Sequence, residues 1–412
     1  MNTVKQTKSS DFIEFFLAII YLPFYYLFLI TKFIKGEIPN ILIFTFSIAL
    51  LLTYGPIMFD VSSNFHIAIL SEFENPYENY TFYNQIIIFL MNSLGLQFNS
   101  IMLIFYWFCL YSTFMLFLKN SNNPIFILFI LILISLVFRN IVDLNRNYTA
   151  FILAIYSIIF FRNNKLIFSF AAFVLALSIH ISCVVFFILY LISRIKALQS
   201  LRWMTYLIYG FLFTLGYFFL DFLQFGFFGN EGTRISMYFS DSSTFGRNVV
   251  GRLLYLRVYD VLFFIILTYL ILKNFNKLNE KQTAILFISF VAVCVALFFY
   301  RTLFERMHIM AILVLFLFLS RNINFINERF VKGLVFSYFL SRFILINVFL
   351  YSHVFSEEYN HIFKDHDLKM EFLIKPLYVP TILLLDYQSN GYSDEVLMTN
   401  LERGKEDFWV ID

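Results

Sequence analysis

The stretch RNIVDLNRNYTAF, residues 139–151, carries two arginines and an aspartate inside a strongly apolar chain. Arg139, Asp143 and Arg146 are spaced i, i+4 and i+7, so on an α-helix they share one face. Guanidinium groups on that face would bind an anion through paired hydrogen bonds, and the carboxylate would neutralise or orient them. The alternative interpretation is a structural ion pair at the end of a membrane helix.

Two more ionisable residues lie in apolar surroundings. His180, in LALSIHISCVV, would move a proton or hold a hydroxyl if it faces a water-filled cavity, and otherwise it is a hydrogen-bonded core residue. Asp60 opens a segment without lysine or arginine, where it would act as a general base towards a hydroxyl or cap the following helix. His180, Asp60 and Asp143 are therefore the candidate catalytic residues.

Composition indicates where this chemistry takes place. The chain has 412 residues, 59 phenylalanines and only 14% charged residues, and its mean hydropathy is +0.77. This leaves too little polar surface to cover a water-soluble globule, so we predict an all-α polytopic integral membrane protein of about 11–14 transmembrane or re-entrant helices. The net charge of +3 does not favour nucleic acid as a partner. The three cysteines lie in apolar runs and are interpreted as packing residues.

A helix of about 20 residues crosses the hydrocarbon core of a bilayer. The candidate spans are 12–31, 40–59, 98–118, 124–138, 147–161, 203–220, 258–272, 283–299, 307–320 and 333–351. Residues 83–95 are short enough for a re-entrant or interfacial helix, and 165–193 fit a pair of short helices that meet near His180. The apolar run 373–385 contains two prolines, and its pattern does not decide whether it spans.

The positions of basic residues predict the orientation. Most loops with lysine fall on the cytoplasmic side if 83–95 is re-entrant and 165–193 returns to its starting side. This assignment gives one membrane domain over residues 1–385, an outer loop at 221–257 and a cytoplasmic tail at 386–412. One conflict remains: Lys32 and Lys35 inside would force Lys5 and Lys8 outside, unless the first segment lies in the membrane plane.

The outer segments between residues 60 and 306 contain arginine and no lysine. Their arginines are Arg139, Arg146, Arg234, Arg247, Arg252, Arg257, Arg301 and Arg306. A guanidinium binds two phosphate oxygens at once and stays protonated when partly desolvated, which a lysine does less well. We therefore predict an anionic ligand at the outer face, most simply a lipid-linked phosphate or diphosphate. Tyr238 is placed to stack on a sugar face.

Several stretches resemble the EpsG-type members of the Wzy-like polysaccharide polymerases. NRNYTAFILAIYSIIFFRNNKLIFSFAAFVLALSIHISCVVFFILYLI is similar to the family signature, in which an arginine opens a span, a basic turn follows, and the next span ends in an isolated histidine. Arg146 and His180 match these two residues, and Asp60, in YGPIMFDVSSNFH, matches an aspartate of the N-terminal segment. RISMYF and LFERMHIMAILVLF resemble later segments and carry over Arg234 and Arg306.

The resemblance implies a membrane glycosyltransferase with a GT-C-like fold. It would join undecaprenyl-diphosphate-linked oligosaccharide repeat units, as an O-antigen polymerase does, at the periplasmic face of a bacterial inner membrane, with a chain-length regulator protein as a further partner. Arg146, Arg139, Arg306, Arg234 and Arg252 would bind the diphosphate. No metal or other cofactor is expected, since the lipid diphosphate already activates the sugar. The alternatives are a flippase for lipid-linked oligosaccharide and an O-antigen ligase-like enzyme.

Overall fold

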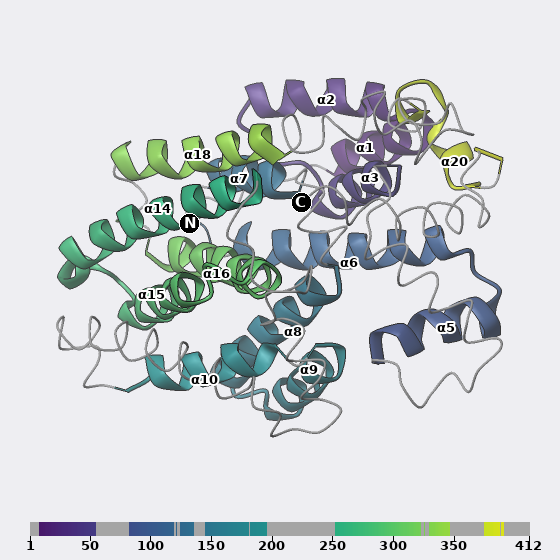
Figure 1. Ribbon diagram of the computed structural model, residues 1–412. Helices are drawn as coiled ribbons and strands as arrows, with labels where there is room; N and C mark the ends of the chain where they lie inside the picture. The colour runs from purple at the N-terminus through teal and green to yellow at the C-terminus, as the bar shows by residue number, and fades with distance from the viewer. Residues whose placement is uncertain are drawn as a thin grey trace. The chain divides into compact units, whose positions relative to one another are not determined.

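The computed structural model describes residues 8–54, 82–118, 121, 124–135, 145–180, 182–195, 252–322, 325, 329–346, 375–387 and 389–390. Over these residues the chain forms helices joined by turns, without a β-strand (Figure 1). Three helical stretches are long and apolar enough to cross a membrane: Phe98–Leu118, Tyr255–Lys273 and Leu303–Arg321. The predicted all-α polytopic membrane class is confirmed.

The chain divides into two compact units. The first contains Met1–Ile152, Ser178–His180 and Phe339–Ile411, and the second contains Leu153–Leu177 and Ile181–Tyr338. Helices α8, α9 and α18 each begin in one unit and end in the other. The prediction of one membrane domain followed by a cytoplasmic tail stays a prediction.

In the first unit, α6 is the central helix. Its helices are α1 (Lys8–Ile20), α2 (Leu22–Ile34), α3 (Ile41–Thr53), α5 (Phe82–Leu94), α6 (Phe98–Leu118), α7 (Pro124–Ser135), the start of α8 (Asn145–Arg162) and α20 (Thr381–Leu384). Helix α6 packs along α3 and also contacts α5 and α7. The short length predicted for the segment near 83–95 is confirmed by α5, which has 13 residues.

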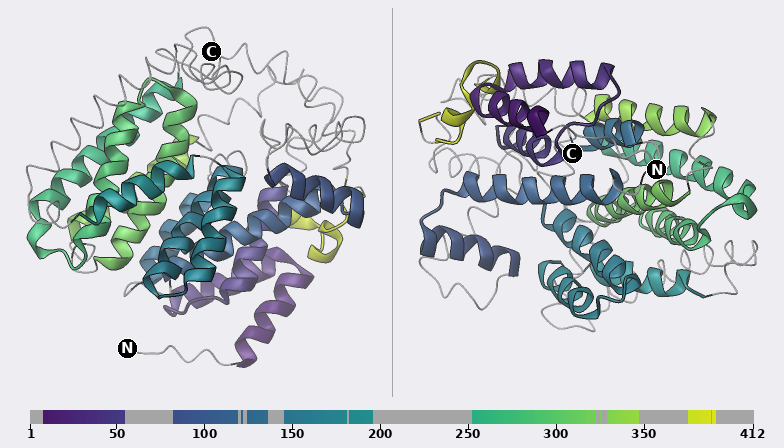
Figure 2. Two further views of the ribbon diagram at one scale, coloured as in Figure 1. Left: turned by 90° about the horizontal axis from the view of Figure 1, so that it is seen from below. Right: turned by 180° about the vertical axis from the view of Figure 1, so that it is seen from behind.

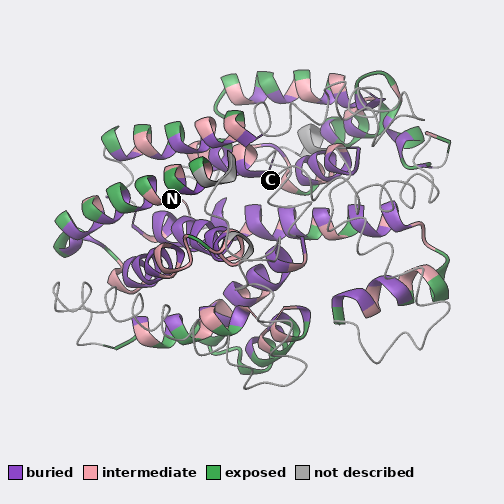
Figure 3. Cartoon of the chain, viewed as in Figure 1, coloured by how far each residue is buried: buried purple, intermediate pink, exposed green. Residues whose placement is uncertain are grey.

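In the second unit, α15 and α16 form the core. Its helices are the rest of α8, most of α9 (Leu166–Ile179), α10 (Cys183–Ser193), α14 (Arg252–Lys273), α15 (Lys281–Ala296), α16 (Arg301–Arg321) and most of α18 (Arg329–Ile344). Helix α15 packs against α16, α10 and α14. Figure 3 shows α15 and α16 almost wholly buried, whereas α14 and α18 each keep an exposed face. Because the exposed faces are rich in large apolar side chains, they suit contact with lipid.

The predicted single span at 12–31 is wrong, since the chain breaks at Tyr21 into α1 and α2. Tyr21 is extended, with φ −161° and ψ 115°, and Pro23 follows within the first turn of α2. A proline lacks the N–H that would continue the hydrogen bonding of α1, so a new helix starts instead. Each helix has 13 residues and so a length of about 20 Å, too short for a hydrocarbon core of about 30 Å.

A buried ion pair holds α1 and α2 together. Lys32 in the last turn of α2 bonds to Glu14 in the middle of α1, and both side chains are almost fully buried. The other oxygen of Glu14 accepts the backbone N–H of Asn40 at 2.8 Å, just before α3. The two short helices are therefore held against each other as a helical hairpin.

The C-terminal run is also broken. Residues 375–378 are helical, and α20 begins only after Pro380, so the described part of 373–385 has no continuous helix that could span. Helix α20 packs against α1, and the hydroxyl of Tyr54 donates to the carbonyl of Leu384. The candidate span at 203–220 lies outside the described residues.

We predict that both ends of the α1–α2 hairpin lie on the same side of the membrane, which removes the conflict among the N-terminal lysines. Single cysteines replacing Ser9 and Glu37, in a background with the native cysteines changed to alanine, would react with a membrane-impermeant maleimide from the same side. Labelling of the two positions from opposite sides would contradict the hairpin.

Candidate functional site

The first turn of α8 is held by hydrogen bonds along one face. The hydroxyl of Tyr83 on α5 donates to Oδ1 of Asn145 at 2.7 Å. The other two contacts are to α6: the Thr149 hydroxyl lies 3.0 Å from the Cys109 sulfur, and the Tyr148 hydroxyl lies 3.2 Å from the Thr113 hydroxyl. Asn145, Tyr148 and Thr149 are spaced i, i+3 and i+4, so a single helix face makes all of these contacts.

Arg146 lies to the side of that face, about 100° around the helix from Asn145, and it is half-buried. Its neighbour Asn147 is 3% exposed, and among the described residues its Oδ1 has no hydrogen-bond partner. A buried amide oxygen without a donor is costly unless water or a ligand satisfies it. The sequence marks Asn147 only through the three-residue NYT pattern, which is common by chance and does not indicate a site.

His180 lies at a break between two short helices, as the sequence predicts. Helix α9 ends at Ile179, α10 begins at Cys183, and His180 is half-buried between them. The helices have 14 and 11 residues, so neither crosses the bilayer by itself. His180 is therefore an ionisable side chain at a break between two apolar helices, and ionisable groups within membrane segments most often serve a function.

A tight turn sends α9 back along α8. Asn164 adopts φ 57°, and the N–H groups of Lys165 and Asn164 donate to the carbonyls of Phe160 and Phe161 at 2.9 and 3.1 Å. This is the Schellman pattern, which ends a helix and reverses the chain. The teal helices α8 and α9 can be followed in both panels of Figure 2.

Two serines set the register of α8 against α9. The Ser157 hydroxyl donates to the Ser169 carbonyl at 2.9 Å, and the Ser169 hydroxyl donates to the Ser157 carbonyl at 2.8 Å. Arg146 lies eleven residues before Ser157, and His180 lies eleven residues after Ser169. For two antiparallel helices of equal rise per residue, this equal spacing predicts that Arg146 and His180 lie at the same height. The clustering of the chain agrees, since it groups Ser178–His180 with the start of α8 in the first unit.

Two other predicted diphosphate ligands lie on helices of the second unit. Arg252 is the first residue of α14, and Arg306, which is half-buried, lies in the second turn of α16. The remaining candidates, Asp60, Arg139, Asp143, Arg234 and Tyr238, lie outside the described residues.

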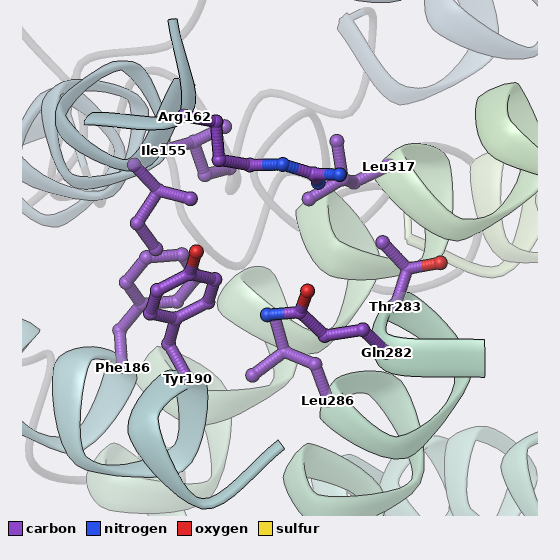
Figure 4. A pocket seen from close by; sticks show the side chains of 9 residues that line it. Ile155, Arg162, Phe186, Tyr190, Gln282, Thr283, Leu286 and Leu317 are labelled. Atoms are coloured by element: carbon purple, nitrogen blue, oxygen red, sulfur yellow. The ribbon is translucent and has the colours of Figure 1, made fainter. Parts of the chain in front are cut away.

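A small hollow lies at the other end of α8, between α8, α10, α15 and α16 (Figure 4). Arg162 and Gln282 line it, but Arg162 is already paired with Glu280 at 2.6 Å. Figure 4 shows the amide of Gln282 pointing into the hollow, and its nitrogen has no hydrogen-bond partner among the described residues. The space suits about one water molecule and is too small for a lipid diphosphate.

The model of the EpsG family matches residues 52–364, well over half of the chain. The chain belongs to the EpsG family. No curated protein and no solved structure matches it. EpsG membership and the helical, apolar architecture together make this a membrane protein of polysaccharide biosynthesis, and the predicted family is confirmed.

The match to the EpsG family covers some of the helices and leaves others outside it. It includes α8, α9, α10, α14 and α16, and hence Arg146, His180 and Arg306. It excludes the α1–α2 hairpin and α20, which pack against each other. The candidate site therefore lies in the part that matches the family model, and the hairpin and α20 lie outside that match.

The register of α8 and α9 is testable by cross-linking. The two serine hydroxyl oxygens lie 3.4 Å apart, so we expect Ser157→Cys with Ser169→Cys to form a disulfide under mild oxidation. The matched control is Ser157→Cys with Phe173→Cys, one turn further along α9, which would stay reduced. Cross-linking of the control pair but not the serine pair, scored by gel mobility, would show that the register is shifted.

Proposed function

We propose that this protein is a polysaccharide polymerase of the O-antigen type. It would transfer a growing glycan from undecaprenyl diphosphate to a sugar hydroxyl on an incoming lipid-linked repeat unit. The site would face the periplasm from a bacterial inner membrane. Support for the chemistry comes mainly from Arg146 and His180, whose equal spacing from the Ser157–Ser169 contact predicts one height.

An arginine and a histidine at the same height supply the two things that this transfer needs. The leaving diphosphate gains negative charge as the bond to the sugar breaks, and a guanidinium fixed in a low-dielectric site stabilises that charge. An imidazole titrates near neutrality and can accept the proton of the attacking hydroxyl. The first turn of α8 is held by hydrogen bonds to α5 and α6, which fixes the backbone from which Arg146 extends before the substrate arrives.

The positions of the arginines on their helices support an anionic substrate. Arg146, Arg252 and Arg301 each stand within the first two residues of a helix predicted to begin at the outer face, and none of these first turns contains an acidic residue. A cation at a helix N-terminus is opposed by the helix dipole, so stability alone does not favour it. An anion bound there would gain from both the backbone N–H groups and the guanidinium.

The proposed step balances without a nucleotide or a metal ion. The acceptor hydroxyl attacks the anomeric carbon and loses its proton to His180, with Asp60 as the alternative acceptor. The carbon–oxygen bond to the diphosphate breaks, and undecaprenyl diphosphate departs with the electron pair towards Arg146 and Arg306. Arg139, Arg234 and Arg252 would support the same charge, Asp143 would orient the guanidinium groups, and Tyr238 would stack on a sugar.

Substitution of the two central residues tests the site. We expect Arg146→Ala to lower elongation at least about 100-fold, because the charge on the leaving group loses a fixed donor. Arg146→Lys would retain about a tenth of the activity, since the charge remains but the planar fork is lost. His180→Ala would also abolish long polymer. Polymer length on gels, at equal membrane levels of each variant, is the measurement.

The matched control is Arg194→Ala, because Arg194 is an exposed arginine at the end of α10 on the predicted cytoplasmic side. This variant would make polymer of normal length. Normal polymer in both Arg146→Ala and His180→Ala would show that the site is assigned to the wrong residues.

Loss of the whole protein separates the proposal from its alternatives. Deletion in a host that makes O-antigen would leave single repeat units attached to the lipid core, since export and ligation continue. Loss of a flippase or of a ligase would leave no repeat unit on the core. A lipopolysaccharide gel distinguishes these patterns, and a core without any repeat unit would contradict polymerase function.

A further inference from the structure

Three buried polar side chains from three helices meet in the second unit. The hydroxyl of Tyr338 on α18 donates to Oδ1 of Asp260 on α14 at 2.7 Å. Nε2 of His308 on α16 lies 3.0 Å from that hydroxyl and 3.4 Å from Oδ2 of Asp260. All three residues are at most 2% exposed. We call Asp260, His308 and Tyr338 the interhelix triad.

The contacts fix the direction of the hydrogen bonds in the triad. The single phenolic proton of Tyr338 goes to Asp260, so the Tyr338 oxygen accepts from Nε2–H of His308. That proton also points towards the second oxygen of Asp260. The carboxylate thus receives a hydroxyl and an imidazole N–H from two different helices.

Aromatic rings enclose the triad. Phe263 stacks on Tyr338 with ring centroids 3.6 Å apart, and Phe304 stacks on His308 with centroids 5.8 Å apart. Phe264 covers the imidazole from α14 at 5.3 Å. Since water is excluded, each hydrogen bond is stronger than it would be at a wet surface, and each would be costly to lose.

Arg257, one turn before Asp260, extends this network to the connection that precedes α16. Its guanidinium donates to the carbonyl of Phe298 at 2.7 Å and lies over the Phe298 ring. Phe298 in turn contacts Phe304, which stacks on His308. The N-terminal part of α14 is therefore joined to α16 both through the connection and through the triad.

The triad lies on the same helices as Arg252 and Arg306, two of the arginines assigned to the diphosphate. Asp260 is eight residues from Arg252 along α14, and His308 is seven residues from Arg301 along α16, so both are about 10–12 Å from the helix starts. Arg306 is only two residues before His308 on the same helix. Any shift of α16 against α14 at the triad would move Arg306.

Stability alone does not require such a triad. Burying a carboxylate at membrane depth costs free energy, and well-packed apolar side chains often replace buried ionic groups without loss. Directional hydrogen bonds instead select one register between helices. Buried polar groups have this role in some helical assemblies. The neighbouring helix faces already offer ample apolar packing, so register is the property that the triad supplies.

We propose that Asp260, His308 and Tyr338 are positioning residues that fix the outer ends of α14 and α16 so that Arg306 meets the lipid diphosphate. This inference rests on the proposed function. The triad does not touch the substrate; it acts through the helix that carries Arg306.

A double-mutant cycle tests this role in purified protein reconstituted with a defined undecaprenyl-diphosphate repeat unit. We expect Tyr338→Phe to lower kcat/KM for elongation about tenfold, because the carboxylate loses one donor. In an Arg306→Ala background the same change would lower kcat/KM less than about twofold, because the arginine that the triad positions is already absent. Asp260→Asn would show the same dependence on Arg306.

The control is Tyr259→Phe, because Tyr259 stacks on Tyr338 and, within the described part of the chain, its hydroxyl bonds only to the Tyr338 backbone carbonyl, at 3.4 Å. Its kcat/KM would stay within about twofold of the unmodified protein. Equal losses for Tyr338→Phe with and without Arg306, or no loss at all, would overturn the positioning role. Unmodified protein that does not elongate the unit would instead overturn the proposed function, and this inference with it.

Discussion

The structure depends on one constraint of the bilayer: polar groups inside it must find partners within the protein. Several polar side chains buried between these helices therefore also fix a helix position. Glu14 and Lys32 close the N-terminal hairpin, Ser157 and Ser169 set the register of α8 and α9, and Asp260 with Tyr338 joins α14 to α18. In a chain whose helices are apolar on most sides, hydrophobic burial alone would leave these registers undefined, because lipid and protein interior are equally favourable surroundings for leucine and phenylalanine.

The same constraint explains how the candidate site is built. The hydrogen bonds of Asn145, Tyr148 and Thr149 hold one face of α8 against α5 and α6, so the backbone that carries Arg146 is fixed. The turn at Asn164 and the serine pair then return the chain, and the equal spacing from the serines predicts His180 at the height of Arg146. Groups fixed before substrate binds need no reorganisation during the reaction, which is the main source of electrostatic catalysis.

Sequence reasoning predicted those features that depend on neighbouring residues. The apolar run 98–118 is α6, and Ser178 and His180 correctly marked the division of 165–193 into two helices. Pro23 carried the signal for the break between α1 and α2, although the run around it reads as one span. Contacts between distant residues, such as Asp260 with Tyr338, left no such signal, because an apolar helix shows no periodic pattern that tells its inward face from its lipid face.

The most direct measurement of the central claim is an experimental structure of the protein bound to a lipid-diphosphate repeat unit. The account predicts phosphate oxygens about 2.8 Å from the guanidinium groups of Arg146 and Arg306, with His180 facing the anomeric carbon. A diphosphate bound instead at the opposite helix ends, near Arg162 and Arg321, would contradict it.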